Sequence, residues 1–299
     1  MKNLDVQAQN TVNITGKLIS ATFGEGTMSD GRFYKRANMV IRVTQQVDTH
    51  EETSEIPVSI FAAKFTKANK ANPGFKNIED LENMKTAENV GIDEADTIRI
   101  RGANIRENNF VSRNGQLIKG WQINASFVNN GKGASDIASF VNEIYIMNMM
   151  DEENREGEST GRLIIRGAIV QYGGALDVLD FIVEDPDKVD YLRRNWEANQ
   201  TVRVNGRIRV KTVEEKKSAS TSSWGEELPE ESTRTVRELI ITGGSDEGFE
   251  EDLAYDPEEI RKAFNVRKAK LEQMQIDAKS GSAKKPVAET KSGGKYDWE

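Results

Sequence analysis

Apolar and polar residues alternate along the first two-thirds of the chain, a pattern typical of half-buried β-strands rather than helices. The alternation predicts strands over 11–23, 35–46, 55–65, 97–106 and 117–128. The polar stretch between the third and fourth strands predicts one short helix with Asn77 as its cap. Three strands, a helix and two strands are the order of a five-stranded OB barrel, so we expect a mostly β fold. A further strand over 140–149 is expected to extend this first sheet.

Part of this pattern repeats later in the chain. Residues 97–102, TIRIRG, match residues 201–206, TVRVNG, and Asp185-Pro186 starts a predicted helix just before the second copy. Because we find one strand fewer than in the first unit, we expect a reduced OB-like domain. The expected division is an OB-fold domain over 1–150, an acidic linker over 151–160, the reduced domain over 161–244, an acidic segment with an amphipathic helix over 245–278, and a disordered tail over 279–299.

The net charge of −8 argues at first against a nucleic-acid partner, because binding phosphates requires Lys and Arg. The acidity is unevenly distributed, however. Residues 1–150 carry as many basic as acidic side chains, whereas residues 245–259 are acidic and contain no basic residue. Such a block is usually a solvated tail or spacer, so the net charge does not exclude a nucleic-acid partner for the first domain. The block could also occupy a cationic binding face and be displaced by a ligand.

Several functional classes are excluded by composition. The chain has no cysteine and a single histidine, His50, which excludes a disulfide framework, a zinc site and a Ser/His/Asp triad. It has no phosphate-binding loop and no dinucleotide fingerprint, so we expect a protein that is not an enzyme and needs no cofactor or metal. A carboxylate-dependent nuclease stays open, because two or three acids can hold Mg²⁺. No stretch is apolar enough for a signal peptide or a membrane span, which favours a soluble cytoplasmic protein.

Aromatic and cationic residues are interleaved in several separate segments. Because Ile98 and Ile100 are expected to face a core, Arg99 and Arg101 project together from the opposite face of their strand. Cations neutralise phosphates, and aromatic rings stack on bases without reading sequence. The candidate residues for binding a single strand are Arg32, Phe33, Tyr34, Lys35, Arg36, Phe61, Lys64, Phe65, Lys67, Arg99, Arg101, Arg106, Phe110, Arg113 and Trp121.

Two stretches, EIPVSIFAAKFTKA and DTIRIRGANIRENNFVSRNGQLIKGWQINASFV, resemble the third strand and the fourth-to-fifth-strand hairpin of bacterial and phage single-stranded DNA-binding proteins. Ile98, Ile100 and Gly102 match the V-x-V-x-G strand of that family, Asn114-Gly115 its polar turn, and Phe61 the Phe of its earlier strand. The resemblance implies an OB fold that coats and protects single-stranded DNA during replication, recombination or repair. The layout with a second unit is most similar to a bacteriophage version, which would act in the cytoplasm of a bacterial host.

The chain ends in Tyr296, Asp297, Trp298 and Glu299. Bacterial members of the family end in an acidic tip with an aromatic or apolar residue, so the resemblance implies recruitment of a polymerase, helicase or primase. The helix expected over 257–276 has an apolar stripe that could dock on a barrel or mediate self-association. RNA stays open as a ligand, and a non-catalytic protein-interaction or virion structural module is the alternative function.

Overall fold

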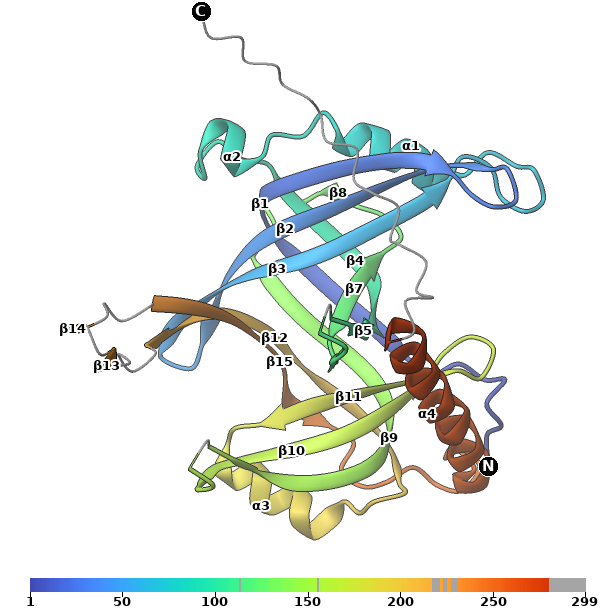
Figure 1. The fold of residues 1–299 in the computed structure, drawn as a ribbon, viewed down its shortest axis with the longest axis vertical. Helices are drawn as coiled ribbons and strands as arrows, with labels where there is room; N and C mark the ends of the chain where they lie inside the picture. Colours follow the sequence, from blue (N-terminus) through green and yellow to red (C-terminus); the bar gives the residue numbers. More distant parts are fainter. Residues whose placement is uncertain (113, 155, 217–220, 223–224, 227–230, 280–299) are drawn as a thin grey trace, which may run out of the picture.

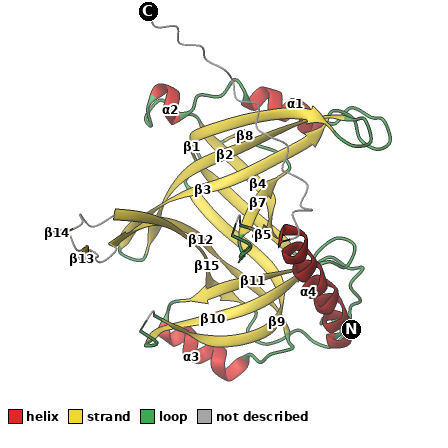
Figure 2. Ribbon diagram, viewed as in Figure 1, coloured by secondary structure: helices red, strands yellow, loops and turns green. Residues whose placement is uncertain are grey.

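The computed structural model describes residues 1–279 except 113, 155, 217–220, 223–224 and 227–230. The chain is mostly β-strand and has four helices within this described part (Figures 1 and 2). The strands are β1 (Asn10–Thr27), β2 (Phe33–Val47), β3 (His50–Ala63), β4 (Thr97–Glu107), β5 (Phe110–Val111), β6 (Leu117–Ile118), β7 (Trp121–Ala125), β8 (Asn129–Asn130), β9 (Ile137–Glu153), β10 (Ser159–Val170), β11 (Leu176–Val183), β12 (Thr201–Lys216), β13 (Thr221–Ser222), β14 (Gly225–Glu226) and β15 (Glu231–Gly244). The helices are α1 (Pro73–Leu81), α2 (Ala87–Val90), α3 (Pro186–Asn195) and α4 (Pro257–Lys279).

Five strands in the first half of the chain pair in a closed circuit, which we call the first ring. The order is β1, β2, β3, β7, β4 and back to β1; the β3–β7 pairing is parallel and the other four are antiparallel. Alternate residues face inward, so Ile41, Ile56 and Ile98 are fully buried. α1 packs against β2 and β3 through its buried apolar face. The expected mostly β architecture is confirmed.

The helix α1 begins earlier than the sequence predicts. Its cap is Asn72, whose side chain accepts a hydrogen bond from the Gly74 amide, and Pro73 occupies the first turn. Proline suits that position because its ring fixes φ and its missing N–H would have no partner there. The side chain of Asn77 instead bonds both backbone groups of Val128, at 2.7 and 2.8 Å, and so ties α1 to the segment after β7. The prediction of Asn77 as the cap is wrong.

A second closed circuit, the second ring, follows the order β9, β10, β11, β15, β12 and back to β9. It has five strands, so the structure differs from the expected reduced domain. The strand predicted over 140–149 is part of β9. It extends the first sheet as expected, because β9 pairs with Asn10–Thr15 of β1, and it also completes the second ring. Figure 1 shows β1 and β9 running between the two rings.

Residues 151–160 are not a linker between domains. They cover the end of β9, a tight turn and the start of β10, and Glu153 pairs with Ser159 across the hairpin. The helix predicted to start at Asp185-Pro186 is confirmed. It is α3, with Asp185 as its cap and Pro186 in its first turn. Trp196, just after this helix, is buried in the hydrophobic core, and its indole N–H donates to the backbone oxygen of Ser245 at 3.2 Å.

The acidic segment after β15 is docked on the second ring rather than being a solvated spacer. The Phe249 amide donates to the backbone oxygen of Thr201 at 2.7 Å, and the Tyr255 amide donates to the Thr201 hydroxyl at 3.0 Å. The Tyr255 ring is buried, and this burial raises the pKa of its hydroxyl, which donates to the backbone oxygen of Val6. The segment is therefore part of the fold, and this packing argues against its acting as a free competitor for a cationic face.

α4 docks on the rest of the chain through its first half. Ile260 is buried, Phe264 packs against the core, and Arg267 forms an ion pair with Glu107 at the end of β4. Part of the apolar stripe is therefore used within the chain, and self-association through 257–276 stays a prediction. In the described part of the chain, no helix combines the length and the apolar character needed to cross a membrane.

Candidate functional site

Three of the candidate side chains meet on the outer face of β2 and β3. The rings of Tyr34 and Phe61 lie 5.0 Å apart between centroids at an interplanar angle of 35°, and Arg36 is the direct cross-strand partner of Phe61. Phe61 is 53% exposed, which is unusual for a large apolar side chain on a sheet. We call Tyr34, Arg36 and Phe61 the aromatic platform. Its rings and guanidinium group are available to a planar, charged ligand.

Two glycines of β1 make room for the aromatic platform. Gly26 is paired with Tyr34, and a Cβ at Gly26 would lie 2.9 Å from the Tyr34 hydroxyl oxygen. Gly24 is paired with Arg36, and a Cβ there would lie 2.9 Å from the Arg36 Nε. Without a side chain on β1, both platform residues can lie across the neighbouring strand. The role of these glycines depends on the β1–β2 register, so no local sequence pattern predicts it.

The candidate cations divide into two groups. Three are held in structural contacts: Arg32 pairs with Asp30 at 2.7 Å, Lys35 with Glu82 at 2.8 Å, and Arg106 with Asp177 at 2.6 Å across the two rings. The hydrogen bond from Arg32 lowers the pKa of Asp30, and the bond to Glu82 raises the pKa of Lys35. The second group has no ion pair within the described residues and consists of Arg36, Lys64, Lys67, Arg99 and Arg101.

The other candidate aromatics lie outside the aromatic platform. Phe33 packs 6.0 Å from Phe75 of α1, which uses it for structure. Phe65 is 40% exposed just beyond β3, and Phe110 is exposed on the β5–β6 hairpin. Trp121 is partly buried against the core. Arg113 lies outside the described residues, as do the tail residues Tyr296, Asp297, Trp298 and Glu299.

Arg99 and Arg101 line a cavity of about 480 Å³ on another side of the first ring. Its remaining wall comes from Asn13 and Thr15 of β1 and from the segment that precedes and begins β9. The two guanidinium groups therefore share one cavity. That cavity contains none of the residues of the aromatic platform.

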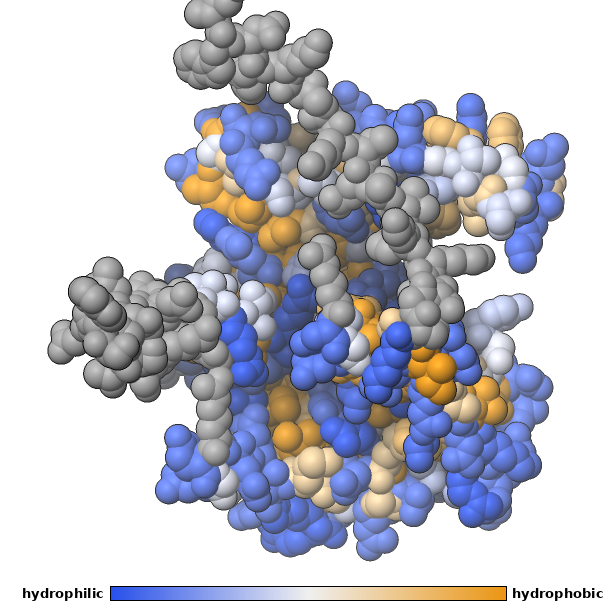
Figure 3. Space-filling view, in the orientation of Figure 1, coloured by the Kyte–Doolittle hydropathy of each residue, from blue (hydrophilic) through white to orange (hydrophobic). Residues whose placement is uncertain are grey.

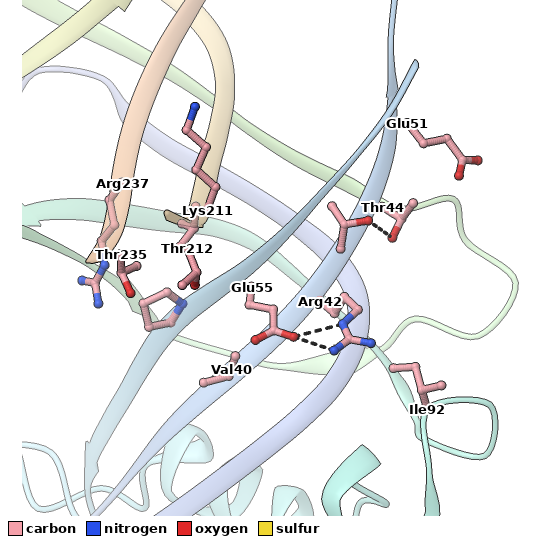
Figure 4. Close-up of a pocket in the computed structure, with 13 residues that line it drawn as sticks. Val40, Arg42, Thr44, Glu51, Glu55, Ile92, Lys211, Thr212, Thr235 and Arg237 are labelled. Carbon is pink, nitrogen blue, oxygen red and sulfur yellow. Dashed lines mark hydrogen bonds and ion pairs between the residues drawn. The ribbon is translucent and has the colours of Figure 1, made fainter. Parts of the chain in front are cut away.

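The outer face of β2 and β3 continues from the aromatic platform into a groove between the rings. The next cross-strand pairs are Asn38–Ser59, Val40–Pro57, Arg42–Glu55 and Thr44–Thr53. The last three pairs line a groove of about 910 Å³, and β12 and β15 form its opposite wall (Figure 4). We call it the inter-ring groove. The residues of its opposite wall are Val210, Lys211, Thr212, Thr235 and Arg237.

In Figure 3 the surface is recessed between the upper and lower parts of the molecule. On one wall of the inter-ring groove Arg42 donates two hydrogen bonds to Glu55, at 3.1 and 2.6 Å. On the other wall, Arg237 shares one face of the β12–β15 pair with Val210, Thr212 and Thr235, and among the described residues it has no ion pair and donates a 3.5 Å bond to the backbone oxygen of Trp121. Lys211 projects from the opposite face of β12, with its amino group pointing away from these residues (Figure 4). The opposite wall therefore offers one cation, Arg237, that no acid among the described residues neutralises.

A cluster of charged side chains holds the two walls of the inter-ring groove together. Arg207 of β12 pairs with Glu52 of β3, and the Val210 amide donates to the Ser54 hydroxyl at 3.1 Å in a buried contact. We call Glu52, Glu184, Glu238, Arg162, Arg207 and Arg209 the charge clamp. Burial alone would raise the pKa of Glu238, but hydrogen bonds from Arg162 and Arg209 outweigh it and lower this pKa. The charge clamp could not be predicted from the sequence, because alternating charges are also typical of a solvent-exposed strand face.

The described residues contain no group of three or more His, Asp or Glu side chains placed to hold a metal ion. The site therefore consists of an exposed aromatic platform, unpaired cations and a polar groove. Such a surface binds by stacking, hydrogen bonding and charge.

Comparisons with known proteins place this fold. A family model described as YorF matches residues 8–277. No curated protein matches the sequence. Among solved structures, the chain is similar to the wild-type single-stranded DNA binding protein from Thermus aquaticus at 9% identity, with a TM-score of 0.50, covering 80% of this chain and 93% of that one. The similarity at this identity is one of fold.

Two further structures give lower scores. A deletion mutant of the Thermus aquaticus protein has 11% identity and a TM-score of 0.49, and covers 84% of this chain and 98% of its own. A small single-stranded DNA-binding protein from Streptomyces coelicolor has 9% identity and a TM-score of 0.26, and covers 41% of this chain and 94% of its own.

Proposed function

The chain belongs to the YorF family, and we propose that it is a non-enzymatic protein that binds, coats and protects single-stranded DNA without sequence preference. The observation that carries this proposal is the aromatic platform. Every base has a face on which Tyr34 or Phe61 can stack, and Arg36, directly across from Phe61, can pair with a phosphate or stack as well. Unpaired cations nearby, such as Lys64 and Lys67, supply charge for the backbone.

The topology supports this proposal. In each ring a helix lies between the third and fourth strands, and the third and fifth strands pair in parallel. We propose that both rings are OB barrels, a fold whose outer strand face and adjoining loops bind oligonucleotides. The similar fold of the Thermus aquaticus protein, which is named for binding single-stranded DNA, agrees with this reading. On this proposal the boundary between the two domains lies at the start of β9.

The cellular role is part of the same proposal. We infer a bacteriophage protein that acts in DNA replication, recombination or repair within a bacterial host. Its terminal residues Tyr296, Asp297, Trp298 and Glu299 would recruit a polymerase, helicase or primase. A pull-down of host replication proteins by the full chain, compared with a chain that ends at Lys279, tests this part separately from DNA binding.

Titration of a fluorescent oligo-dT tests the binding function. Wild-type protein should bind at low salt, lose affinity steeply as salt rises, and bind duplex far more weakly. Phe61→Ala and Tyr34→Ala should each weaken binding by about tenfold or more, because a stacked base contributes about 2 kcal/mol. Tyr172→Ala is the matched control, since Tyr172 is an aromatic residue that is 88% exposed on the β10–β11 turn.

A flat titration of the wild-type protein would reject DNA binding and favour the protein-interaction module. Equal affinity of the wild type and both platform variants would instead reject the aromatic platform as the site. Cleavage of labelled DNA that depends on Mg²⁺ would replace the binding function by a nuclease activity. An oligo-rU titration beside the oligo-dT one measures the preference for DNA over RNA.

A further inference from the structure

We propose that a bound strand continues from the aromatic platform into the inter-ring groove, so that β12 and β15 of the second ring contact the same strand. The inference rests on the proposed function and adds a path to it. The surface assigned to the second ring lies on β12 and β15, and not on β10 and β11, the strands that correspond to β2 and β3 in the topology.

The first argument is the continuity of the surface. Tyr34, Arg36, Asn38, Val40, Arg42 and Thr44 are alternate residues of β2 and so share one face of it. The platform residues begin this row, and its last three members line the inter-ring groove. Ten residues of strand span about 33 Å, a length that accommodates several nucleotides. A strand stacked on Tyr34 and Phe61 can therefore follow the sheet directly into the groove.

The second argument is the chemistry of the opposite wall. Arg237 can pair with a phosphate, and the hydroxyls of Thr212 and Thr235, which lie on the same face as Arg237, can donate to phosphate oxygens. Val40, Pro57, Ile92 and Val210 give the groove apolar surface for sugars and bases. Two acids also line it. Glu55 is bonded to Arg42, and Figure 4 shows Glu51 on the side away from Lys211 and Arg237.

The outer face of β10 and β11 lacks the side chains that a second binding surface would need. By position in the topology, β10 and β11 correspond to β2 and β3. Their cross-strand pairs are Ile164–Ile182, Arg166–Asp180 and Ala168–Val178, so this face has no aromatic ring. Two cations lie on this face, and both are paired: Arg166 is held by two bonds to Asp180 at 2.7 and 2.9 Å, and Arg162 pairs with Glu238 at 2.6 Å. Within the described residues the second ring therefore has no platform of its own, whereas its Arg237, which has no ion pair there, lines the inter-ring groove.

The groove is also present before any ligand binds. The buried bond from Val210 to Ser54 and the pairing of Arg207 with Glu52 hold β12 against β3. A strand that enters the groove does not have to bring the two rings together. Preorganisation of this kind lowers the free-energy cost of binding.

The variant Arg237→Ala tests the path with two oligo-dT lengths. A short oligonucleotide of about 8 nucleotides fits on the aromatic platform, and one of about 30 reaches the groove. We expect Arg237→Ala to weaken binding of the long oligonucleotide about fivefold and to reduce its salt slope by about 0.7, the value for one lost phosphate contact. Binding of the short oligonucleotide should not change. Arg166→Ala, the control on the β10–β11 face, should leave both affinities unchanged.

The outcomes separate the two proposals. If wild-type protein binds neither oligonucleotide, the proposed function itself fails. If the wild type binds and Arg237→Ala matches it on the long oligonucleotide, the path through the groove is wrong. Equal weakening of both lengths also rejects the path, because the groove would then be part of the primary site. Thermal unfolding of Arg237→Ala checks that it is folded.

Discussion

Gly206 in β12 occupies a position where no side chain fits. A Cβ there would lie 1.9 Å from the backbone oxygen of Ile240 and 2.7 Å from the ring of Phe140. Gly102, which the sequence repeat aligns with Gly206, has a φ of +70° and open space around it. The two glycines are thus required for different reasons, one for close packing and the other for a left-handed backbone conformation.

We predict that Gly206→Ala lowers the free energy of unfolding by about 3 kcal/mol, because the strands β12 and β15 must move apart. Gly102→Ala should cost only about 1 kcal/mol, the strain of a left-handed alanine. Urea denaturation of both variants measures the difference. Equal losses would show that β12 relaxes around the new methyl group without displacing β15.

The residues of the aromatic platform could be predicted only in part. The sequence identified segment 32–36 as rich in aromatics and cations, but it could not separate Tyr34 and Arg36 from Phe33 and Lys35. Alternation places these two pairs on opposite faces, and the packing of Phe33 on Phe75 of α1 decides which face is open. That contact joins residues far apart in the sequence, so no local pattern contains it.

At the scale of elements, α4 and the hairpin of β5 and β6 lie side by side, as Figure 1 also shows. Arg267 and Glu107 form an ion pair with both side chains nearly buried, at 13% and 12% exposure. Because this pair joins α4 to the base of the hairpin, α4 restrains the segment between β4 and β7. If the first ring is an OB barrel, as we propose, this segment is one of the loops that commonly contact the ligand.

We predict that Arg267→Ala speeds hydrogen exchange of the backbone amides between residues 108 and 120, because it leaves Glu107 buried without a partner. Amides of β9 and β12 should exchange as in the wild type. Arg261→Ala is the control in the same helix, since its pair with Glu258 is exposed and contributes little to stability. Unchanged exchange in the hairpin would show that α4 does not restrain it.

Strand positions were predictable because alternation reports the two faces of a strand, but partners were not. The segment 140–149 was recognised as a strand, yet its membership of the second ring depends on long-range pairing with β10 and β12. The segment 151–160 looked like a linker because it is acidic, and the structure shows that it makes a hairpin. Composition describes the solvent exposure of such a segment and not its backbone pairing.

For the whole molecule, the two rings share a strand interface and cannot separate without breaking it. β9 pairs with β1 over six residue pairs, and the charge clamp and the Ser54–Val210 bond add contacts at the other end. We predict a single unfolding transition in urea, with coincident curves from circular dichroism and tryptophan fluorescence. Two separate transitions would mean that each ring is stable alone and that the groove can open.

The charge clamp makes this stability depend on pH. Because the pKa of Glu238 is lowered in the folded chain, its contribution to stability is complete above its ordinary value and is lost as the pH falls through the lower folded value. Glu238→Gln should therefore cost roughly 2 kcal/mol at pH 7, where it leaves two partly buried arginines without this carboxylate. Below about pH 4 the difference from the wild type should shrink, since a protonated Glu resembles Gln.

Urea denaturation of the wild type and Glu238→Gln between pH 3.5 and pH 7 measures this difference. The comparison between the two proteins is needed because Asp177 acts with the opposite sign: burial raises its pKa despite the attraction of Arg106, so protonation of Asp177 favours the folded chain. That effect is common to both proteins and cancels in the difference. Glu197→Gln, a change at an exposed position, is the control. A difference that stays constant across the pH range would mean that Glu238 stabilises the walls of the groove through packing rather than through its charge.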